Sequence, residues 1–217
     1  MMESMALPGL ERLLDVCQRL NLGLETAPPA REPLSAGEAL VGVPFDPVLA
    51  SVYARLGHAV FAAKVMCWAL IRWDDNDHSL RERNEWWREN WWEELGQPVI
   101  VFGGGVFTYA TVPGLADDWG RQPVVMVDTY EFEPRVIPVA SSVDRFFDTY
   151  ARYLEAKVSE PSYRTSGEVD IGFPYDAVSL VARDERLVEL MRAGRFDALM
   201  RNVEDGTRRW AAQVMGR

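Results

Sequence analysis

The sequence predicts an α+β fold in which an antiparallel β-meander packs against helices and a helical C-terminal extension follows. Two observations carry this prediction. Between residues 98 and 140, short runs of β-branched and aromatic residues are separated by Gly, Pro and Asp, with no helical pattern between them. Strands that follow one another without intervening helices usually pair antiparallel. Before and after this region, apolar residues recur at the spacing of amphipathic helices.

The first helix is expected near residues 8 to 21. Pro8 stands where a first helical turn tolerates proline, and Asn21 and Gly23 mark the end. The apolar residues at helical spacing are Leu10, Leu13, Leu14, Cys17 and Leu20. The stretch ETAPPAREPLSAGE that follows is typical of a proline-rich connection. Residues 1–34 are therefore expected to form an N-terminal helix and a linker.

The second helix is expected to begin after Asp46, a favourable capping residue, with Pro47 in its first position. Gly57 is a natural stop for this helix. Its apolar face consists of Leu49, Val52, Tyr53 and Leu56. The longest apolar run, AVFAAKVMCWALI, comes next; it is interrupted by Lys64 and is far too short to span a bilayer. No membrane-spanning segment is expected.

Four strands are then expected, in the runs PVIVFG, VFTYATV, PVVMVDTY and PRVIPVA. The segment SSVDRFFDTYARYLEAK follows as a helix. It opens with Ser141-x-x-Asp144, which is similar to a capping box with Asp in the place of the preferred Glu or Gln. Its apolar stripe is formed by Val143, Phe146, Phe147, Tyr150 and Leu154. Residues 35–157 are expected to form one α+β domain.

Residues 158–217 are expected to form a loop and a helical extension. Loop composition fills residues 158 to 174, and helical patterns return in DERLVELMRAGRFDALMRN and TRRWAAQVM, with a break near Gly194. The charge also changes, because residues 182 to 217 hold eight arginines against six acidic residues. We expect the extension to lie against the main domain or a neighbouring subunit, and a chain of residues 1–157 to fold without it.

The segment NEWWRENWWEELG, residues 84 to 96, contains four of the chain's eight tryptophans. At about 100° per residue, one helical stripe is expected to face the core and holds Leu80, Trp87, Trp91 and Leu95. Trp86 and Trp92 lie roughly 120° to either side of this stripe. The acidic residues beside them are Glu85, Glu89 and Glu93. Because one buried face cannot hold all four rings, Trp86 and Trp92 need another cover: the C-terminal helices, a second subunit or a binding partner.

The chain carries a formal net charge of −10 over 217 residues. Such a charge repels nucleic acid and anionic membranes, and it attracts basic partners at low salt. The two cysteines, Cys17 and Cys67, lie in apolar sequence, as expected for buried thiols in a reducing compartment. The N-terminus carries Glu11, Arg12 and Asp15 where a signal peptide would be apolar. We therefore expect a cytoplasmic protein.

Motifs for catalysis or cofactor binding are not matched. In DDNDHSLRERNE, Ser79 occupies the position at which a calcium loop needs glycine. FGGGVF lacks the spacing of a phosphate-binding loop and suits a tight hairpin. His58 and His78 have no neighbouring Cys or His to form a metal site. Asp128 and Glu131 belong to a group of loop acids for which solvated side chains are a simpler interpretation than a paired-carboxylate site. No cofactor and no enzymatic activity are expected.

Three phrases resemble the SUKH superfamily, the Smi/Knr-like proteins. They are VPFDPVLASVYARLGHAVF, a proline-led helix ending at glycine; IVFGGGVFTYATVP, a first hairpin; and PVASSVDRFFDTYARYLE, a closing strand and helix. The likeness spans about residues 35 to 157, although Val143 stands where the family often has an aromatic residue and His58 replaces the usual residue after Gly57. The tryptophan segment and the chain after residue 160 lie outside it. The resemblance implies a single α+β binding scaffold, which many bacterial members use as an immunity protein against polymorphic toxins, and it implies no catalytic residues.

We therefore expect a non-catalytic protein-binding domain, an immunity protein that binds and neutralises a cognate basic toxin. The expected partner-binding residues are Trp86, Trp92, Glu85, Glu89, Glu93, Asp128 and Glu131. No binding of nucleic acid or membranes is expected. The sequence leaves open whether the chain forms a homodimer. Two alternatives remain: a protein-interaction adaptor unrelated to toxins, and an enzyme of unrecognised type.

Overall fold

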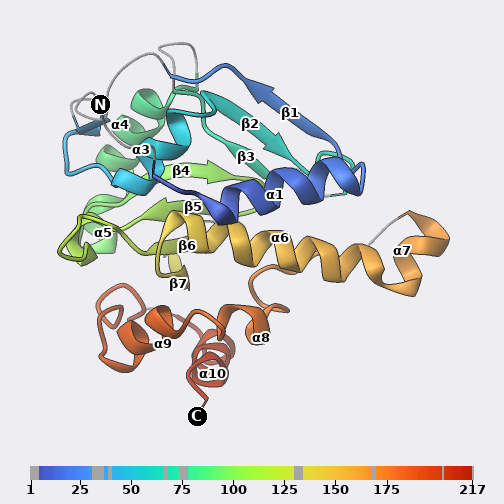
Figure 1. Ribbon diagram of the computed structural model, residues 1–217. Helices are drawn as coiled ribbons and strands as arrows, with labels where there is room; N and C mark the ends of the chain where they lie inside the picture. Colours follow the sequence, from blue (N-terminus) through green and yellow to red (C-terminus); the bar gives the residue numbers. More distant parts are fainter. Residues whose placement is uncertain are drawn as a thin grey trace.

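The structure is a computed structural model, and it describes residues 5–30, 37–38, 41–65, 68–73, 78–129, 134–167, 170–201 and 203–216. Over these residues the chain forms a seven-stranded sheet in which each strand pairs antiparallel with the next one in sequence (Figure 1). The strands are β1 (Leu24–Ala27), β2 (His58–Phe61), β3 (Trp68–Leu70), β4 (Ile100–Gly104), β5 (Thr108–Thr111), β6 (Val124–Asp128) and β7 (Arg135–Ala140). The predicted α+β class with an antiparallel meander is confirmed.

The helices within the described ranges are α1 (Pro8–Arg19), α3 (Pro47–Tyr53), α4 (Leu80–Asn90), α5 (Trp92–Leu95), α6 (Val143–Ser159), α7 (Pro161–Ser166), α8 (Val178–Val181), α9 (Glu185–Arg192) and α10 (Asp205–Val214), with a 3-10 turn, η1, at Pro113–Leu115. The predicted helices are confirmed by α1, α3, α6, α9 and α10. Asp46 caps α3 as predicted, because its Oδ1 accepts a hydrogen bond from Leu49 N at 2.7 Å. Gly194 follows α9 in the left-handed conformation, with φ at 69°, which explains the predicted break.

Strands β1 to β3 are not among the predicted strands. β1 lies inside the stretch expected to be a proline-rich linker, and Pro28 follows it directly. It is an edge strand with one neighbour, β2. β2 and β3 lie inside the long apolar run, where no alternation of polar and apolar residues marks a strand. These strands are three or four residues long, and pairing over such a length depends on the neighbouring strands rather than on local sequence.

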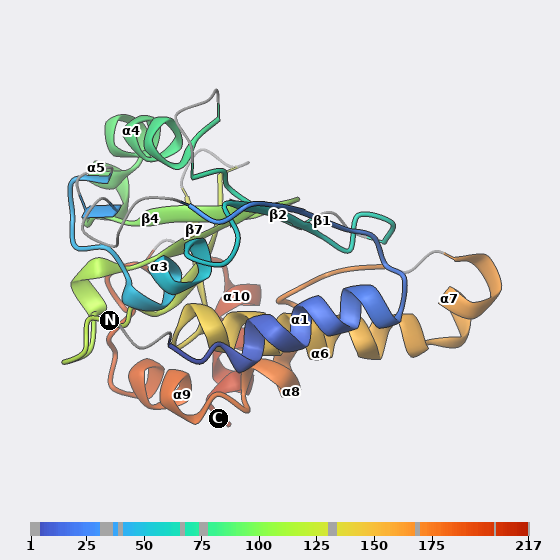
Figure 2. The same ribbon diagram turned by 45° about the horizontal axis from the view of Figure 1, so that its top comes forward.

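An aromatic core lies between the sheet and α6. Figure 2 shows α1 and α6 side by side on one side of the sheet, with α4 on the other side. Trp68 of β3 is buried at the centre of this core. Its ring centroid lies 5.4 to 6.3 Å from those of Phe61, Phe102, Tyr109, Phe146, Phe147 and Tyr150. The predicted apolar stripe of α6 is confirmed, since all of its residues are fully buried.

The capping box predicted at the start of α6 is wrong by one residue. Ser142, not Ser141, is the N-cap, and its Oγ accepts from Arg145 N at 3.3 Å. The Asp144 carboxylate is turned towards α1 instead, where it accepts from the backbone N–H groups of Gly9 and Leu10 at 3.0 Å. A carboxylate at the start of a helix satisfies donors that the helix itself leaves unpaired. Asp144 therefore joins the two helices rather than closing its own.

The C-terminal extension packs on the same side of the sheet as α6 (Figure 2). Phe173 is fully buried. Its ring centroid lies 5.2 to 6.3 Å from those of Tyr109, Phe146, Tyr150 and Tyr153. Asp184 Oδ2 accepts from Ser141 N at 2.7 Å, next to the start of α6. The boundary predicted after residue 157 falls inside α6, and the extension shares the aromatic core of the residues before it.

Candidate partner-binding site

Helix α4, which carries the first two tryptophans of the segment, begins with a capping box. Ser79 is the N-cap, and its Oγ accepts from Glu82 N at 3.3 Å. The Glu82 carboxylate in turn accepts from the backbone N–H of His78. The signal in the sequence is the spacing Ser79-x-x-Glu82, which is typical of such a box. The box holds Glu82 at the start of the helix.

Asn84 fastens α4 to the sheet. Its Nδ2 donates to Val101 O at 2.9 Å and to Leu80 O at 2.8 Å, and its Oδ1 accepts from Val101 N at 2.8 Å. β3 pairs with β4 only at Gly103 and Gly104, so this side of Val101 has no strand beside it. The amide of Asn84 makes the two bonds that a strand would make. Because Asn84 is fully buried, these bonds give α4 one orientation on β4.

That orientation leaves Trp86 on the outer side of α4, where it is 47% exposed. Its ring lies edge-on to two neighbours, with centroids 6.2 Å from Trp87 and 6.5 Å from Trp91. Trp87 is buried as predicted. Trp91 is only half-buried, because α4 ends there with φ at −129° and the continuous helix assumed for residues 80 to 95 is broken. Trp86 is therefore an exposed ring held by a tryptophan cluster.

Three acidic side chains and Arg83 lie around Trp86. Glu82 and Glu89 lie about one helical turn before and after it on the same face, and Glu85 adjoins it in sequence. The carboxylates of Glu85, Glu89 and Glu93 are exposed and make no ion pair or hydrogen bond within the described part of the chain. We refer to Glu82, Glu85, Trp86 and Glu89 as the acidic tryptophan face. Its negative charge is available to a cation outside the protein.

A hollow of about 260 Å³ lies beside the exposed ring, lined by His78, Glu82, Arg83 and Trp86. An indole surface next to a carboxylate is a favourable place for a cationic side chain, which is attracted by both groups. Glu82 is held there by the capping box. The acidic tryptophan face thus combines an exposed ring with an indentation beside it.

Trp92 has an internal role instead. It is half-buried, and its Nε1 donates to Val99 O at 3.1 Å. The guanidinium carbon of Arg88 lies 5.2 Å from its ring centroid, and Arg88 also donates to Val41 O at 2.6 Å. The cover predicted for Trp92 therefore comes from neighbouring residues of its own chain. The C-terminal extension also reaches the end of this segment, because a Cβ at Gly96 would lie 2.7 Å from a guanidinium nitrogen of Arg201.

The last two predicted site residues do not join this face. Asp128 is buried at the end of β6, opposite Arg135 of β7. It lines a separate open pocket with Tyr175 and Glu204 of the C-terminal extension. Glu131 lies outside the described residues. Of the predicted set, the structure brings together only the residues of α4 and α5.

Trp119 is an exposed aromatic residue that the sequence pattern did not single out. It is 75% exposed, more than Trp86, and lies in the loop between β5 and β6. The available signal is the phrase DDWG, in which a tryptophan stands in a polar turn instead of on an apolar stripe.

Among the residues that the structure describes, no group of three or more His, Cys, Asp or Glu side chains is placed to hold a metal ion. Within those residues, no helix has both the length and the apolar character needed to cross a membrane.

Comparison with known proteins leaves the family unassigned. No protein-family model matches the chain, and no characterised protein matches it either. The SUKH resemblance therefore rests on the three sequence phrases alone.

Proposed function

We propose that this chain is a non-catalytic protein-binding domain that binds a basic protein through its acidic tryptophan face. The observation that carries the proposal is Trp86, a large aromatic side chain that is exposed and held by Trp87 and Trp91. Tryptophan is enriched among the residues that dominate binding energy. A ring that is already fixed loses little conformational entropy when a partner covers it.

The charge of the face favours a basic partner. The whole chain carries a formal charge of −10, and Glu85 and Glu89 have no internal partner among the described residues. An acidic surface attracts a basic protein over a distance and raises the rate of association. A lysine or arginine of the partner would lie over the Trp86 indole, next to the Glu82 carboxylate.

Among basic partners we favour a toxin that this protein neutralises, which makes the chain a cytoplasmic immunity protein. The resemblance of residues 35 to 157 to the SUKH superfamily supports this role, as does the acidic charge. Neutralisation needs only a tight complex that covers the toxin's working surface, so a binding domain without its own chemistry is sufficient. A stable complex with a housekeeping protein would instead identify an adaptor.

Trp86→Ala and Trp92→Ala separate binding from stability. Trp86→Ala should weaken binding of the cognate toxin by about 2 kcal/mol or more, with a smaller change in melting temperature than Trp92→Ala, because the Trp86 side chain is 47% exposed. Trp92→Ala should lower the unfolding free energy by about 2 kcal/mol, because it removes a half-buried ring and its bond to Val99. Calorimetric titration and thermal unfolding measure the two effects.

Two further variants test the role of charge. Glu85→Gln with Glu89→Gln should slow association at low salt and leave dissociation almost unchanged. The matched control is Glu185→Gln, which removes an exposed carboxylate on α9, on the other side of the sheet. Unchanged toxin affinity in Trp86→Ala, or a loss explained entirely by a lower melting temperature, would contradict the proposed face.

A further inference from the structure

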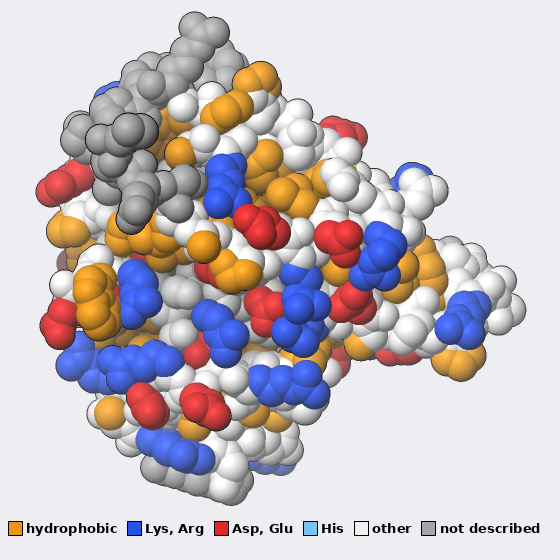
Figure 3. All heavy atoms as spheres, viewed as in Figure 1, with side chains coloured by type: hydrophobic (Ala, Val, Ile, Leu, Met, Phe, Trp, Pro, Cys, Tyr) orange, Lys and Arg blue, Asp and Glu red, His pale blue; other side chains and the backbone are white. Residues whose placement is uncertain are grey.

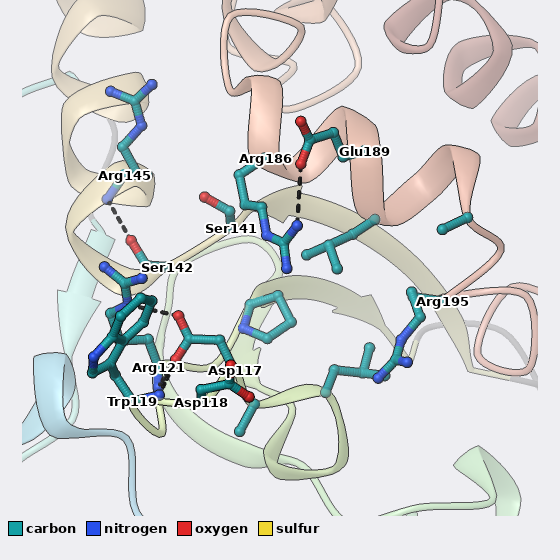
Figure 4. A pocket seen from close by; sticks show the side chains of 15 residues that line it. Asp117, Asp118, Trp119, Arg121, Ser141, Ser142, Arg145, Arg186, Glu189 and Arg195 are labelled. Atoms are coloured by element: carbon teal, nitrogen blue, oxygen red, sulfur yellow. Dashed lines mark hydrogen bonds and ion pairs between the residues drawn. The ribbon is translucent and has the colours of Figure 1, made fainter.

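A pocket of about 650 Å³ lies between the β5–β6 loop, the start of α6 and α9. Figure 4 shows the side chains of these three segments around it. Four of the lining residues are arginines, namely Arg121, Arg145, Arg186 and Arg195, and Trp119 forms part of the wall. We refer to this site as the arginine pocket. Helices α6 and α9, which line it, lie on the opposite side of the sheet from α4 (Figure 2).

The arginine pocket is much less acidic than the protein as a whole. Because Arg145 points away from it, the other three arginines are balanced by three acidic residues, Asp117, Asp118 and Glu189, whereas the whole chain carries a formal charge of −10. Figure 3 shows Lys and Arg side chains gathered on this face, over α9 and the start of α6. The first turn of α6 adds the positive end of a helix dipole. An anion therefore meets a more favourable potential here than the net charge suggests.

Asp117 is neutralised within its own loop. Its Oδ1 accepts from the backbone N–H groups of Trp119 and Arg121, both at 2.9 Å, and its Oδ2 accepts from Arg121 Nε at 2.7 Å. Partial burial acts to raise the pKa of Asp117, but the hydrogen bonds from Arg121 and Trp119 outweigh it, so the net pKa is lowered. The carboxylate stays charged and holds the loop in shape.

The same loop presents Trp119 as a flat surface. The guanidinium carbon of Arg121 lies 4.8 Å from the centroid of the Trp119 ring, and covers one face. The residue is nevertheless 75% exposed, so the opposite face of the ring is open. An open indole face beside a cation is a stacking platform for another flat ring.

Arg186 and Arg195 supply hydrogen-bond donors that the protein itself hardly uses. Figure 4 shows both guanidinium groups directed into the space between α9 and the β5–β6 loop, while Arg145 points away along α6. Arg186 pairs with Glu189 at 3.1 Å, with side chains 60% and 64% exposed, and such a surface pair contributes little. Arg195 makes no ion pair within the described residues. A guanidinium fork matches the oxygens of a phosphate.

We propose that the arginine pocket binds a small phosphorylated ligand that carries a flat ring, the chemical class to which nucleotides belong. The phosphate lies between Arg186 and Arg195, and the ring stacks on the open face of Trp119. The volume of about 650 Å³ is typical of small-molecule sites. The site goes beyond the proposed protein-binding function and does not depend on it, because it shares no residue with the acidic tryptophan face.

Calorimetric titration of the full chain with AMP, adenosine and inorganic phosphate tests the proposal. AMP should bind saturably and about tenfold more tightly than either fragment, because both recognition elements act together. Arg186→Gln and Arg195→Gln should each weaken AMP binding about tenfold. Trp119→Ala should weaken AMP binding and leave the affinity for inorganic phosphate unchanged. Arg164→Gln is the matched control, since it removes an exposed charge on α7, outside the pocket.

A spectroscopic readout keeps the test independent of stability. The indole N–H resonance of Trp119 is identified by its loss in Trp119→Phe, and AMP should shift it in the native protein. Trp86→Ala should bind AMP normally, which separates this site from the protein-binding face. The proposal is overturned by the absence of saturable AMP binding, by equal affinity for adenosine, or by full AMP affinity in a variant that combines Arg186→Gln with Arg195→Gln.

Discussion

Trp86 and Trp92 lie close together in sequence, yet their neighbours assign them different roles. The indole N–H of Trp92 has an acceptor in Val99 O, and Arg88 covers its ring. Trp86 has ring contacts on its inner edge and solvent outside. For an individual tryptophan, the environment of the indole N–H group and of the ring therefore decides whether the side chain supports the fold or remains available to a partner.

Asp46 is a second residue whose behaviour follows from burial. It is fully buried, and its two oxygens accept from Leu49 N at 2.7 Å and from Gln122 N at 2.5 Å. It thereby joins the start of α3 to the chain just before β6. Burial raises its pKa to about 6, although the hydrogen bonds from Leu49 and Gln122 favour the charged form. Burial destabilises the charged carboxylate more than these hydrogen bonds stabilise it.

Asp46 should make stability depend on pH. The folded pKa of about 6 lies above the value of about 3.9 for an unfolded chain, so the folded protein binds a proton more tightly. This contribution to stability is present at acidic pH and is lost as the pH rises through about 6. The unfolding free energy of the native protein minus that of Asp46→Asn should be about 2 kcal/mol larger at about pH 4.5 than at about pH 7.5. Urea denaturation of both proteins at the two pH values measures this difference in unfolding free energy. A difference that does not change with pH would contradict the raised pKa of Asp46.

At the scale of elements, single polar side chains fix how helices meet their neighbours. Asn84 replaces a missing strand beside β4, and Asp144 caps α1 from α6. Gly9 permits the second junction, because a Cβ there would lie 1.9 Å from the Asp144 carbonyl oxygen. Each junction satisfies backbone groups that would otherwise be buried without partners. The junction that Asn84 makes with β4 also sets the direction in which Trp86 points.

Asn84→Ala should destabilise the protein by about 3 kcal/mol, because it leaves the buried N–H and C=O groups of Val101 without partners. Asn90→Ala is the matched control on the same helix: Asn90 is exposed and donates only to Trp86 O, so its loss should cost less than about 0.5 kcal/mol. Chemical denaturation of both variants measures the difference. Equal effects would show that the Asn84 bonds are not what holds α4 on the sheet.

The elements that were predicted are those with a strong local signal. The stripe of α6 and the cap of α3 are readable because the residues that matter lie within a few positions of one another. β1 was missed because its only partner, β2, lies about thirty residues away in the chain. The role predicted for Asp144 is wrong for the same reason. Its carboxylate accepts hydrogen bonds from Gly9 N and Leu10 N, which lie more than a hundred residues away in the chain.

At the scale of the whole molecule, the sheet separates two surfaces of different character. Helix α4, which carries the acidic tryptophan face, lies on one side of the sheet, and α6 and α9, which line the arginine pocket, lie on the other side (Figure 2). The C-terminal extension contributes Arg186 and Arg195 to the pocket and Phe173 to the core. The extension therefore lines the proposed ligand site and also takes part in the packing of the core.

A chain that ends at Lys157 should lose its cooperative unfolding transition. The sequence pattern predicts that it folds alone, but the structure predicts the opposite, because truncation removes Phe173 from the rings around it and Asp184 from Ser141. Thermal unfolding followed by near-ultraviolet circular dichroism should show a shallow change. Phe173→Ala in the full chain should cost about 3 to 5 kcal/mol and stay cooperative. A sharp transition in the truncated chain would show that residues 1–157 fold without the extension and would contradict this prediction.

Local patterns were enough to predict the α+β class, the strands β4 to β7 and the main helices, because periodicity and capping act over a few residues. They also indicated that four tryptophans cannot share one buried face. Packing between distant parts of the chain is what leaves Trp86, rather than Trp92, exposed. The same holds for the arginine pocket, whose arginines come from the β5–β6 loop, α6 and the region of α9. Both depend on contacts between residues far apart in the chain, and no local pattern encodes those contacts.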